Sequence, residues 1–98
     1  MGIRTIYATI GNSDDKLSQA RWAEFAREFV KIIRIQADEI HGVWWSGPDQ
    51  PWQNCCVGFS VKDEGDRTEL LRESLALLRQ HYDQDAVAWV RGYPPEMI

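Results

Sequence analysis

The chain has 98 residues, a hydrophobic fraction of 44%, a charged fraction of 27% and a formal net charge of -4 at pH 7. This length is that of one domain with one core, and the balance of apolar and charged residues excludes a chain that is disordered throughout. The negative charge argues against a general nucleic-acid-binding protein, because affinity for phosphates comes from clustered lysine and arginine side chains.

The start of the chain and its cysteines indicate a compartment. Residues 1–4 lead straight into a mixed segment without a secretory signal, and no apolar run approaches the roughly 20 residues of a membrane span. Cys55 and Cys56 are neighbours on a predicted strand, so their side chains point to opposite faces and a disulfide between them is geometrically poor. These features predict a reduced, cytoplasmic protein without a membrane partner.

The first part of the chain predicts a strand followed by a helix. Residues 3–10 alternate between two faces and are rich in β-branched side chains, which is typical of a strand. Turn-forming residues at 11–15 end it. Residues 18–37 carry apolar side chains at helical spacing, and Ser18 is suited to cap the helix.

The second part predicts a hairpin, a helix and a last strand. Residues 40–46 and 54–62 resemble strands, and two prolines in the loop at 47–51 separate them. Residues 66–82 predict a helix that opens with Asp66 and Glu69 at capping-box spacing. Residues 86–93 predict the last strand, which Pro94 and Pro95 end. The domain therefore takes up residues 1–93, and residues 94–98 form a tail.

This order of elements indicates the fold class. Strand–helix–strand followed by strand–helix–strand is the order of the ferredoxin-like split βαβ fold, written βαββαβ. In this α+β fold both helices cover one face of a four-stranded antiparallel sheet, and right-handed crossovers select the arrangement over its mirror image. The alternative is a different α+β sandwich built from the same elements.

The sheet face away from the helices is the first candidate site. If Val43 pairs with Cys56, the alternation along the strands places two tryptophans, a tyrosine and two valines on this face. An apolar area of this size often marks an interface, whose centre is typically rich in aromatic residues and arginine. A slip of one residue in the hairpin would exchange Trp44 and Trp45 between the two faces. The predicted interface consists of Tyr7, Val43, Trp45, Val87, Trp89 and Arg91.

Three interpretations of this face remain open. The leading hypothesis is a non-enzymatic module that forms a homodimer, as in dimeric α+β barrels, or binds another protein there. The face could instead stack single-stranded nucleic acid, although the acidic charge counts against that. The tail could also fold over the face and cover it.

The loops at one end of the sheet give a second hypothesis, a small-ligand-binding domain or small enzyme. Solvated turns and helix caps explain the same residues, and their spacing fits no calcium loop. Cys56 and His41 share the open face in the predicted register, but such a pair without an orienting residue does not make a catalytic site. The sequence therefore predicts no catalytic residue, metal or cofactor. The residues that would line the loop pocket are Asn12, Asp14, Asp15, Trp52 and Asn54.

Two stretches resemble small uncharacterised proteins from actinobacteria and their phages. These are Tyr7-Ala8-Thr9-Ile10-Gly11-Asn12-Ser13-Asp14-Asp15-Lys16-Leu17 and Pro51-Trp52-Gln53-Asn54. The resemblance implies no activity for any residue. It implies an origin in a mobile element or in a defence or counter-defence system, where small single-domain binding proteins are common.

Overall fold

A computed structural model describes residues 3–47, 52–62, 66–92 and 98 of the chain. The order of the elements confirms the prediction, and each predicted boundary lies within two residues of the observed one. Residues 93–97, which include the end of the predicted last strand and most of the tail, lie outside the described residues. The interpretation in which the tail covers the sheet concerns these residues and stays a prediction. The elements are β1 (Ile3–Gly11), the short 3-10 helix η1 (Ser13–Asp15), α1 (Gln19–Gln36), β2 (Glu39–Trp45), β3 (Asn54–Lys62), α2 (Asp66–His81) and β4 (Ala88–Gly92).

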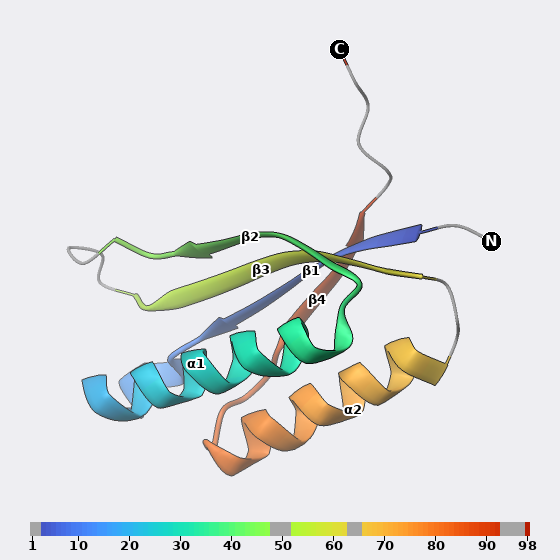
Figure 1. Ribbon diagram of the computed structural model, residues 1–98. Helices are drawn as coiled ribbons and strands as arrows, with labels where there is room; N and C mark the ends of the chain where they lie inside the picture. The colour runs from blue at the N-terminus through green and yellow to red at the C-terminus, as the bar shows by residue number, and fades with distance from the viewer. Residues whose placement is uncertain (1–2, 48–51, 63–65, 93–97) are drawn as a thin grey trace.

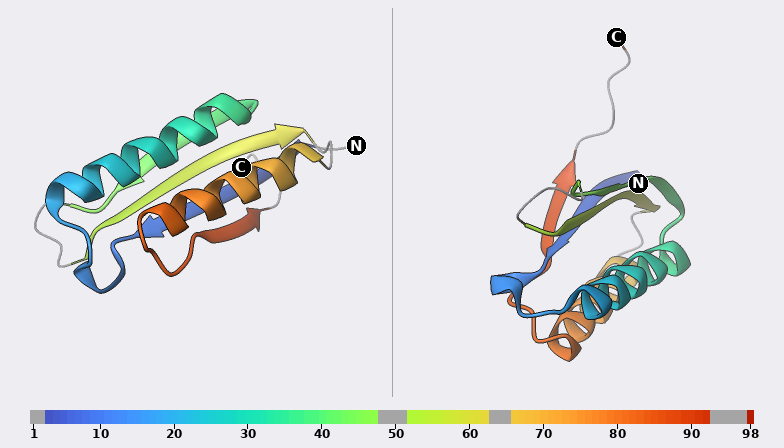
Figure 2. Two further views of the ribbon diagram at one scale, coloured as in Figure 1. Left: turned by 90° about the horizontal axis from the view of Figure 1, so that it is seen from below. Right: turned by 90° about the vertical axis from the view of Figure 1, so that its left-hand side faces the viewer.

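The four strands form one antiparallel sheet in the order β2-β3-β1-β4. Both helices lie on the same side of this sheet (Figures 1 and 2). No helix of the described chain covers the other face. The predicted ferredoxin-like α+β fold is therefore confirmed.

The core lies between the sheet and the two helices. In β1, Ile6, Ala8 and Ile10 are at most 1% exposed, as their alternation predicts. Each large apolar side chain removed from water in this way contributes roughly 1.5–3 kcal/mol to folding. The helices and β3 supply the rest of the core, which includes Trp22, Phe25, Phe29, Ile33, Cys55, Val57, Phe59, Val61, Leu71 and Leu75.

Polar side chains fix both ends of α1. The backbone N–H of Arg21 donates to Ser18 Oγ at 3.2 Å, which confirms Ser18 as the cap. After the helix, Asp38 accepts from the backbone N–H of Lys62 at 2.7 Å and from Arg67 at 3.2 Å. The Lys62 N–H and the Arg67 guanidinium lower the pKa of the Asp38 carboxyl from its ordinary value. Asp38 therefore joins the end of α1 to β3 and to the start of α2.

The register of the hairpin differs from the predicted one. Val43 pairs with Val57 and not with Cys56, and a bulge lies between Ile40 and Gly42. A bulge adds one unpaired residue to its strand and so reverses the facing of the residues beyond it. As a result, Val43 and Trp45 lie on the helix side, contrary to the prediction. Trp44 lies on the opposite side instead.

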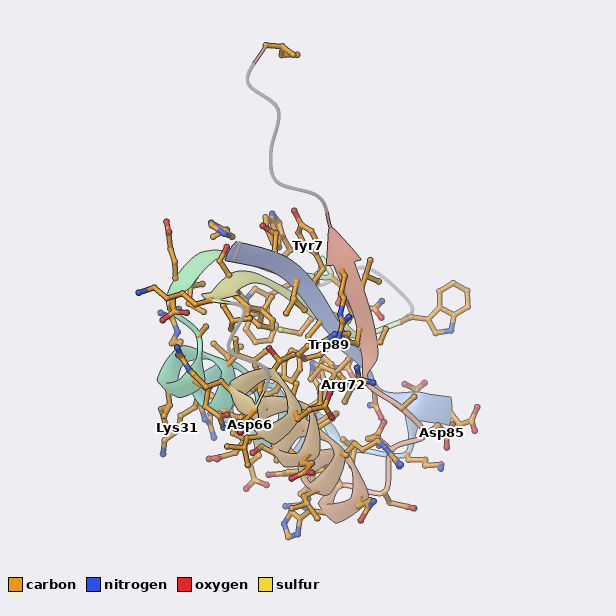
Figure 3. All side chains as sticks on the ribbon, turned by 90° about the vertical axis from the view of Figure 1, so that its right-hand side faces the viewer. Tyr7, Lys31, Asp66, Arg72, Asp85 and Trp89 are labelled. Atoms are coloured by element: carbon orange, nitrogen blue, oxygen red, sulfur yellow. The ribbon has the colours of Figure 1, made fainter. Side chains whose placement is uncertain are left out.

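The facing of β4 was also predicted wrongly. Trp89 pairs with the buried Ala8, so Val87, Trp89 and Arg91 share the helix side of the sheet. The small side chain of Ala8 lets the indole of Trp89 reach Phe59, with the ring centroids 5.9 Å apart in an edge-to-face arrangement. Figure 3 shows Tyr7 on the side of the sheet away from the helices and Trp89 on the side of α2. Of the predicted interface residues, Tyr7 alone faces away from the helices.

Candidate functional site

The surface of the sheet that faces away from α1 and α2 is the candidate site, and we call it the open face. Strand pairing assigns its residues, because partners in adjacent strands point to the same side. They are Thr5, Tyr7, Thr9 and Gly11 of β1, Glu39, Gly42 and Trp44 of β2, Asn54, Cys56, Gly58, Ser60 and Lys62 of β3, and Ala88, Val90 and Gly92 of β4.

Two aromatic rings lie directly over glycines on the open face. A Cβ atom added to Gly58 would be 3.0 Å from the Trp44 ring and 3.0 Å from the Tyr7 ring. A Cβ atom on Gly42 would be 2.9 Å from the Trp44 ring, and one on Gly92 would be 3.3 Å from the Tyr7 ring. Such contacts are possible only because glycine has no side chain. The glycines therefore let both rings lie low against the sheet.

Trp44, Tyr7 and Val90 form an exposed apolar strip across the sheet. Tyr7 is 39% exposed, Trp44 53% and Val90 57%. Val90 pairs directly with Tyr7, and Gly58 lies between the Tyr7 and Trp44 rings. The strip therefore runs from β2 to β4 without a charged side chain within it. An apolar surface of this kind is typical of a binding face.

A polar group lies beside the strip at one end of β2. His41 Nε2 lies 2.5 Å from Ser60 Oγ, and His41 Nδ1 lies 3.9 Å from Glu39 Oε1. Although a serine, a histidine and a carboxylate in this order resemble a nucleophilic triad, Ser60 is only 5% exposed. Its hydroxyl is therefore closed to a substrate, and the hydrogen bond joins β2 to β3.

The two cysteines lie on opposite sides of the sheet and form no disulfide. Burial raises the pKa of the Cys55 thiol to about 12, with a smaller contribution from Cys56. Cys56 is partly exposed on the open face and pairs with Trp44. Because His41 contacts Ser60, the predicted approach of His41 to Cys56 does not occur. Among the described residues, neither thiol is hydrogen-bonded to a base.

At the loop end, Asn12 has a structural task. Its side-chain N–H groups donate to the carbonyl oxygen of Leu17 at 2.9 Å and to Gln53 Oε1 at 2.7 Å. Its side-chain oxygen accepts from the backbone N–H of Leu17 at 2.9 Å. Both donors of the amide are thus engaged by the protein, and the side chain is 9% exposed. Asn12 therefore joins the end of β1 to the start of α1 and to the start of β3.

The other predicted loop residues do not form one pocket. Asp14 and Asp15 are exposed and have the left-handed φ angles of 52° and 55°, which suit a tight turn. Trp52 and Asn54 line a surface pocket together with Trp44, and Asp14 and Asp15 are not among its lining residues. The described residues include no group of three or more His, Cys, Asp or Glu side chains that could hold a metal ion.

Comparisons with known proteins support the fold alone. No protein-family model and no curated protein matches the sequence. The C-terminal domain of the MgtC protein from Mycobacterium tuberculosis superposes with a TM-score of 0.58 at 14% identity, over 93% of this chain and 89% of that domain. A hydroxynitrile lyase from Passiflora edulis gives 0.55 at 11% identity over 98% and 95% of the two chains. The protein At3g17210 from Arabidopsis thaliana gives 0.52 at 9% identity over 99% of both chains.

Identities this low carry no activity from these proteins to this one. The resemblance to actinobacterial and phage proteins stays a prediction. Neither described helix has the length and apolar character needed to cross a membrane.

Sequence reasoning missed Trp44 and Val90 as residues of the open face. Two signals were present. The three glycines that lie under the rings occur in three different predicted strands, and a glycine inside a strand often marks a close approach of another group. The adjacent tryptophans also made the facing of the hairpin depend on a single register choice.

Proposed function

We propose that the protein is a non-enzymatic module that binds a second copy of itself through the open face. The observation that carries the proposal is the strip of Trp44, Tyr7 and Val90, whose aromatic rings lie against glycines on a face that neither helix covers. Aromatic residues supply a large contact area at low entropic cost and are enriched at the centres of interfaces. The proposed site is the same face of the sheet that the sequence predicted. Five of the six residues predicted for it lie elsewhere, and only Tyr7 belongs to it.

The size of the open face supports this function. Four strands about 4.8 Å apart, with an average length of about 25 Å, give a face of roughly 500 Å² in projection. The accessible area of a face covered with side chains is larger than its projection. It therefore approaches the roughly 800 Å² per partner that a standard interface buries.

The charge of the open face also favours a second copy as the partner. In a two-fold interface a patch meets the same patch, so charges of one sign would repel. Glu39 and Lys62 carry opposite charges, and the strip between β2 and β4 is apolar. Arg91, which the sequence had placed on this face, lies on the helix side. Without clustered cations on the described open face, single-stranded nucleic acid is the weaker alternative.

The proposal is tested by placing a charge in the strip. Val90→Asp puts a carboxylate where the second copy would exclude water, so the dimer should dissociate at least about tenfold more readily. Leu77→Asp is the matched control, because Leu77 is exposed to a similar extent, 67%, and lies on α2. Sedimentation velocity measures both variants against the unchanged protein. A Val90→Asp protein that associates as strongly as the Leu77→Asp protein would overturn the proposal.

The mobile-element origin that the sequence resemblance implies is compatible with such a module. It is a separate proposal, and the measurement above does not depend on it.

A further inference from the structure

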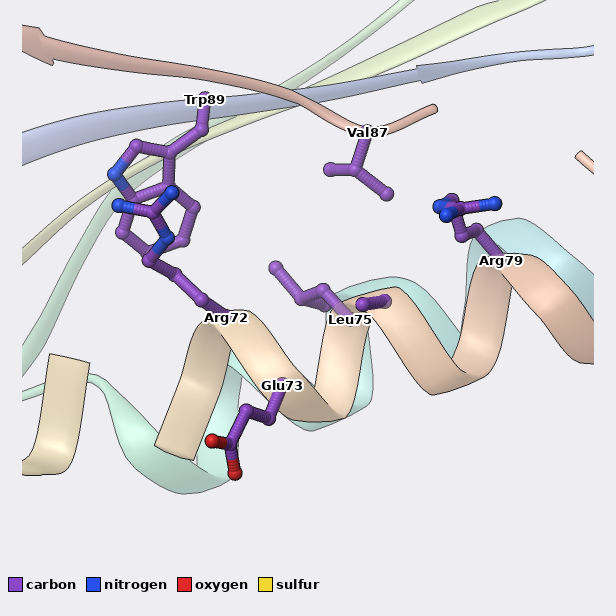
Figure 4. A pocket seen from close by; sticks show the side chains of 7 residues that line it. Arg72, Glu73, Leu75, Arg79, Val87 and Trp89 are labelled. Atoms are coloured by element: carbon purple, nitrogen blue, oxygen red, sulfur yellow. The ribbon is translucent and has the colours of Figure 1, made fainter. Parts of the chain in front are cut away.

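The cations beside the two edges of the sheet differ in their contacts. A pocket of about 310 Å³ lies between α2 and the edge strand β4 (Figure 4). There the Arg79 guanidinium donates to the carbonyl oxygen of Gln84 at 3.1 Å, and the Arg72 guanidinium carbon lies over the Trp89 ring, 5.5 Å from its centroid. Glu73 adds a carboxylate to the same pocket. The arginines of this pocket are therefore engaged within the chain.

At the opposite edge of the sheet, a groove of about 390 Å³ lies between α1 and the end of β2. Its apolar side chains include Ile35, which is 72% exposed, and Trp45, which is 55% exposed. Large apolar side chains left exposed beside a groove are typical of a binding site. The residues that line it, and that define the α1–β2 groove, are Arg27, Val30, Lys31, Arg34, Ile35 and Trp45.

Three cations border the α1–β2 groove. Arg27, Lys31 and Arg34 follow one another at helical spacing along one side of α1, and all three are exposed. None of them makes an ion pair or a hydrogen bond with the described residues. The two carboxylates of α1, Glu24 and Glu28, line a different hollow toward α2, which Arg27 borders as well. The positive charge along the groove therefore suits an anionic partner.

The backbone of β2 is free along the same edge. Among the described strands, β2 pairs with β3 alone. The N–H of Ser46 donates to the carbonyl oxygen of Asn54 at 3.0 Å, which makes these residues a hydrogen-bonded pair of the antiparallel ladder. Because hydrogen-bonded and non-hydrogen-bonded pairs alternate, the N–H and C=O groups of Val43 and Trp45 point away from β3. These groups can pair with a further strand.

We infer that the α1–β2 groove binds an acidic peptide, which adds to β2 as an extended strand. In this binding mode, backbone hydrogen bonds supply affinity and pockets for alternate side chains supply specificity. An apolar side chain at the centre of the peptide packs against Trp45 and Ile35, and a carboxylate two residues away on either side meets the cations of α1. The spans agree, because residues four apart in a strand are about 13 Å apart, and Arg27 and Arg34, seven apart in a helix, are about 10 Å apart.

The charges favour this partner over a second copy of the chain at the same edge. If β2 paired with itself about a two-fold axis, the same patch would meet itself, and Lys31 and Arg34 would approach like charges. A single-stranded nucleic acid would meet the cations but would leave the free backbone groups of β2 unpaired. The groove lies on the helix side of the sheet, so this inference goes beyond the proposed self-association and does not depend on it.

The test uses the peptide Glu-Thr-Val-Thr-Glu with blocked ends, in which the glutamates and the valine lie on one side of an extended strand. In a ¹H–¹⁵N spectrum of the protein, the amide signals of Val43 and Trp45 should shift saturably as the peptide is added. Replacing both glutamates of the peptide with lysine should weaken binding at least about tenfold, because repulsion replaces attraction. Equal affinity for the acidic and the basic peptide would overturn the inference, as would unshifted Val43 and Trp45 signals.

Strand addition is tested by methylating backbone nitrogens of the peptide. A strand presents its N–H groups alternately to its two sides, so either the threonine nitrogens or those of glutamate and valine face β2. Methylation of one set should abolish binding, and methylation of the other set should be tolerated. Two methylated peptides that bind equally well, or that both fail to bind, would overturn strand addition.

A pair of double variants assigns the charge. Lys31→Gln with Arg34→Gln removes two cations of the groove and should weaken binding of the acidic peptide roughly fivefold. Lys62→Gln with Arg91→Gln removes the same charge from exposed positions outside the groove and should leave binding unchanged. Equal affinity of the two double variants would overturn the inference.

Two further outcomes would assign the groove to another partner and so overturn the inference. If the acidic peptide dissociates the self-associated protein, a second copy occupies the edge of β2. If a short single-stranded oligothymidylate shifts the Val43 and Trp45 signals as strongly as the peptide does, the groove binds nucleic acid.

Discussion

Single polar side chains fix the connections of this small domain, and Asn12 is the clearest case. Replacing Asn12 with alanine removes the hydrogen-bond partner of the Leu17 N–H, of the Leu17 carbonyl and of Gln53 Oε1 at a partly buried site. We expect a loss of about 2 kcal/mol or more in the free energy of unfolding, measured by urea denaturation. Asn54→Ala, at an exposed position, should cost less than about 0.5 kcal/mol. Equal stability of the two variants would show that the Asn12 bonds do not hold this end together.

Asp38 makes the stability of the fold depend on pH. Its folded-state pKa is lowered, first by the Lys62 backbone N–H and then by Arg67. The carboxylate therefore contributes stability above its ordinary pKa of 3.8, and this contribution is lost as the pH falls through the lower folded-state value. The difference in unfolding free energy between the unchanged protein and Asp38→Asn should shrink over that acidic range. A difference that stays constant from neutral to strongly acidic pH would contradict this role.

At the scale of elements, periodicity was enough to predict each α-helix and strand but not the facing of two strands. The alternation of β1 identified its buried face because apolar and polar residues separate cleanly there. Both faces of the predicted last strand are apolar, with Val87 and Trp89 on one face and Ala88 and Val90 on the other. The alternation therefore does not indicate which face is buried. In β2, a bulge next to Gly42 reversed the facing of both tryptophans, and the glycine was the one sequence signal of it.

The glycines beneath the rings give a prediction about the open face. In Gly58→Ala the new Cβ atom would lie 3.0 Å from both the Trp44 and Tyr7 rings. Because both rings are partly exposed, we expect them to move outward while the sheet persists, at a cost of about 1 kcal/mol. The near-ultraviolet circular dichroism should change and self-association should weaken, with the far-ultraviolet spectrum retained. Unchanged association in Gly58→Ala would mean that the low position of the rings is not needed.

At the scale of the whole molecule, the fold leaves two surfaces with different chemistry. The strip on the open face is apolar, whereas the pocket between α2 and β4 has Arg72, Glu73 and Arg79 beside its apolar side chains. The sequence predicted the open face from its strand pattern but not the pocket, because the pocket depends on which residues of α2 meet the edge strand. Those contacts depend on the facing of Trp89, which was predicted wrongly from the sequence.

Self-association through the open face makes the mass of the protein depend on its concentration. Light scattering over a wide range of protein concentrations measures this most directly. We expect a molar mass that rises with concentration to twice the 11.4 kDa of one chain. A mass of 11.4 kDa at every concentration would contradict it.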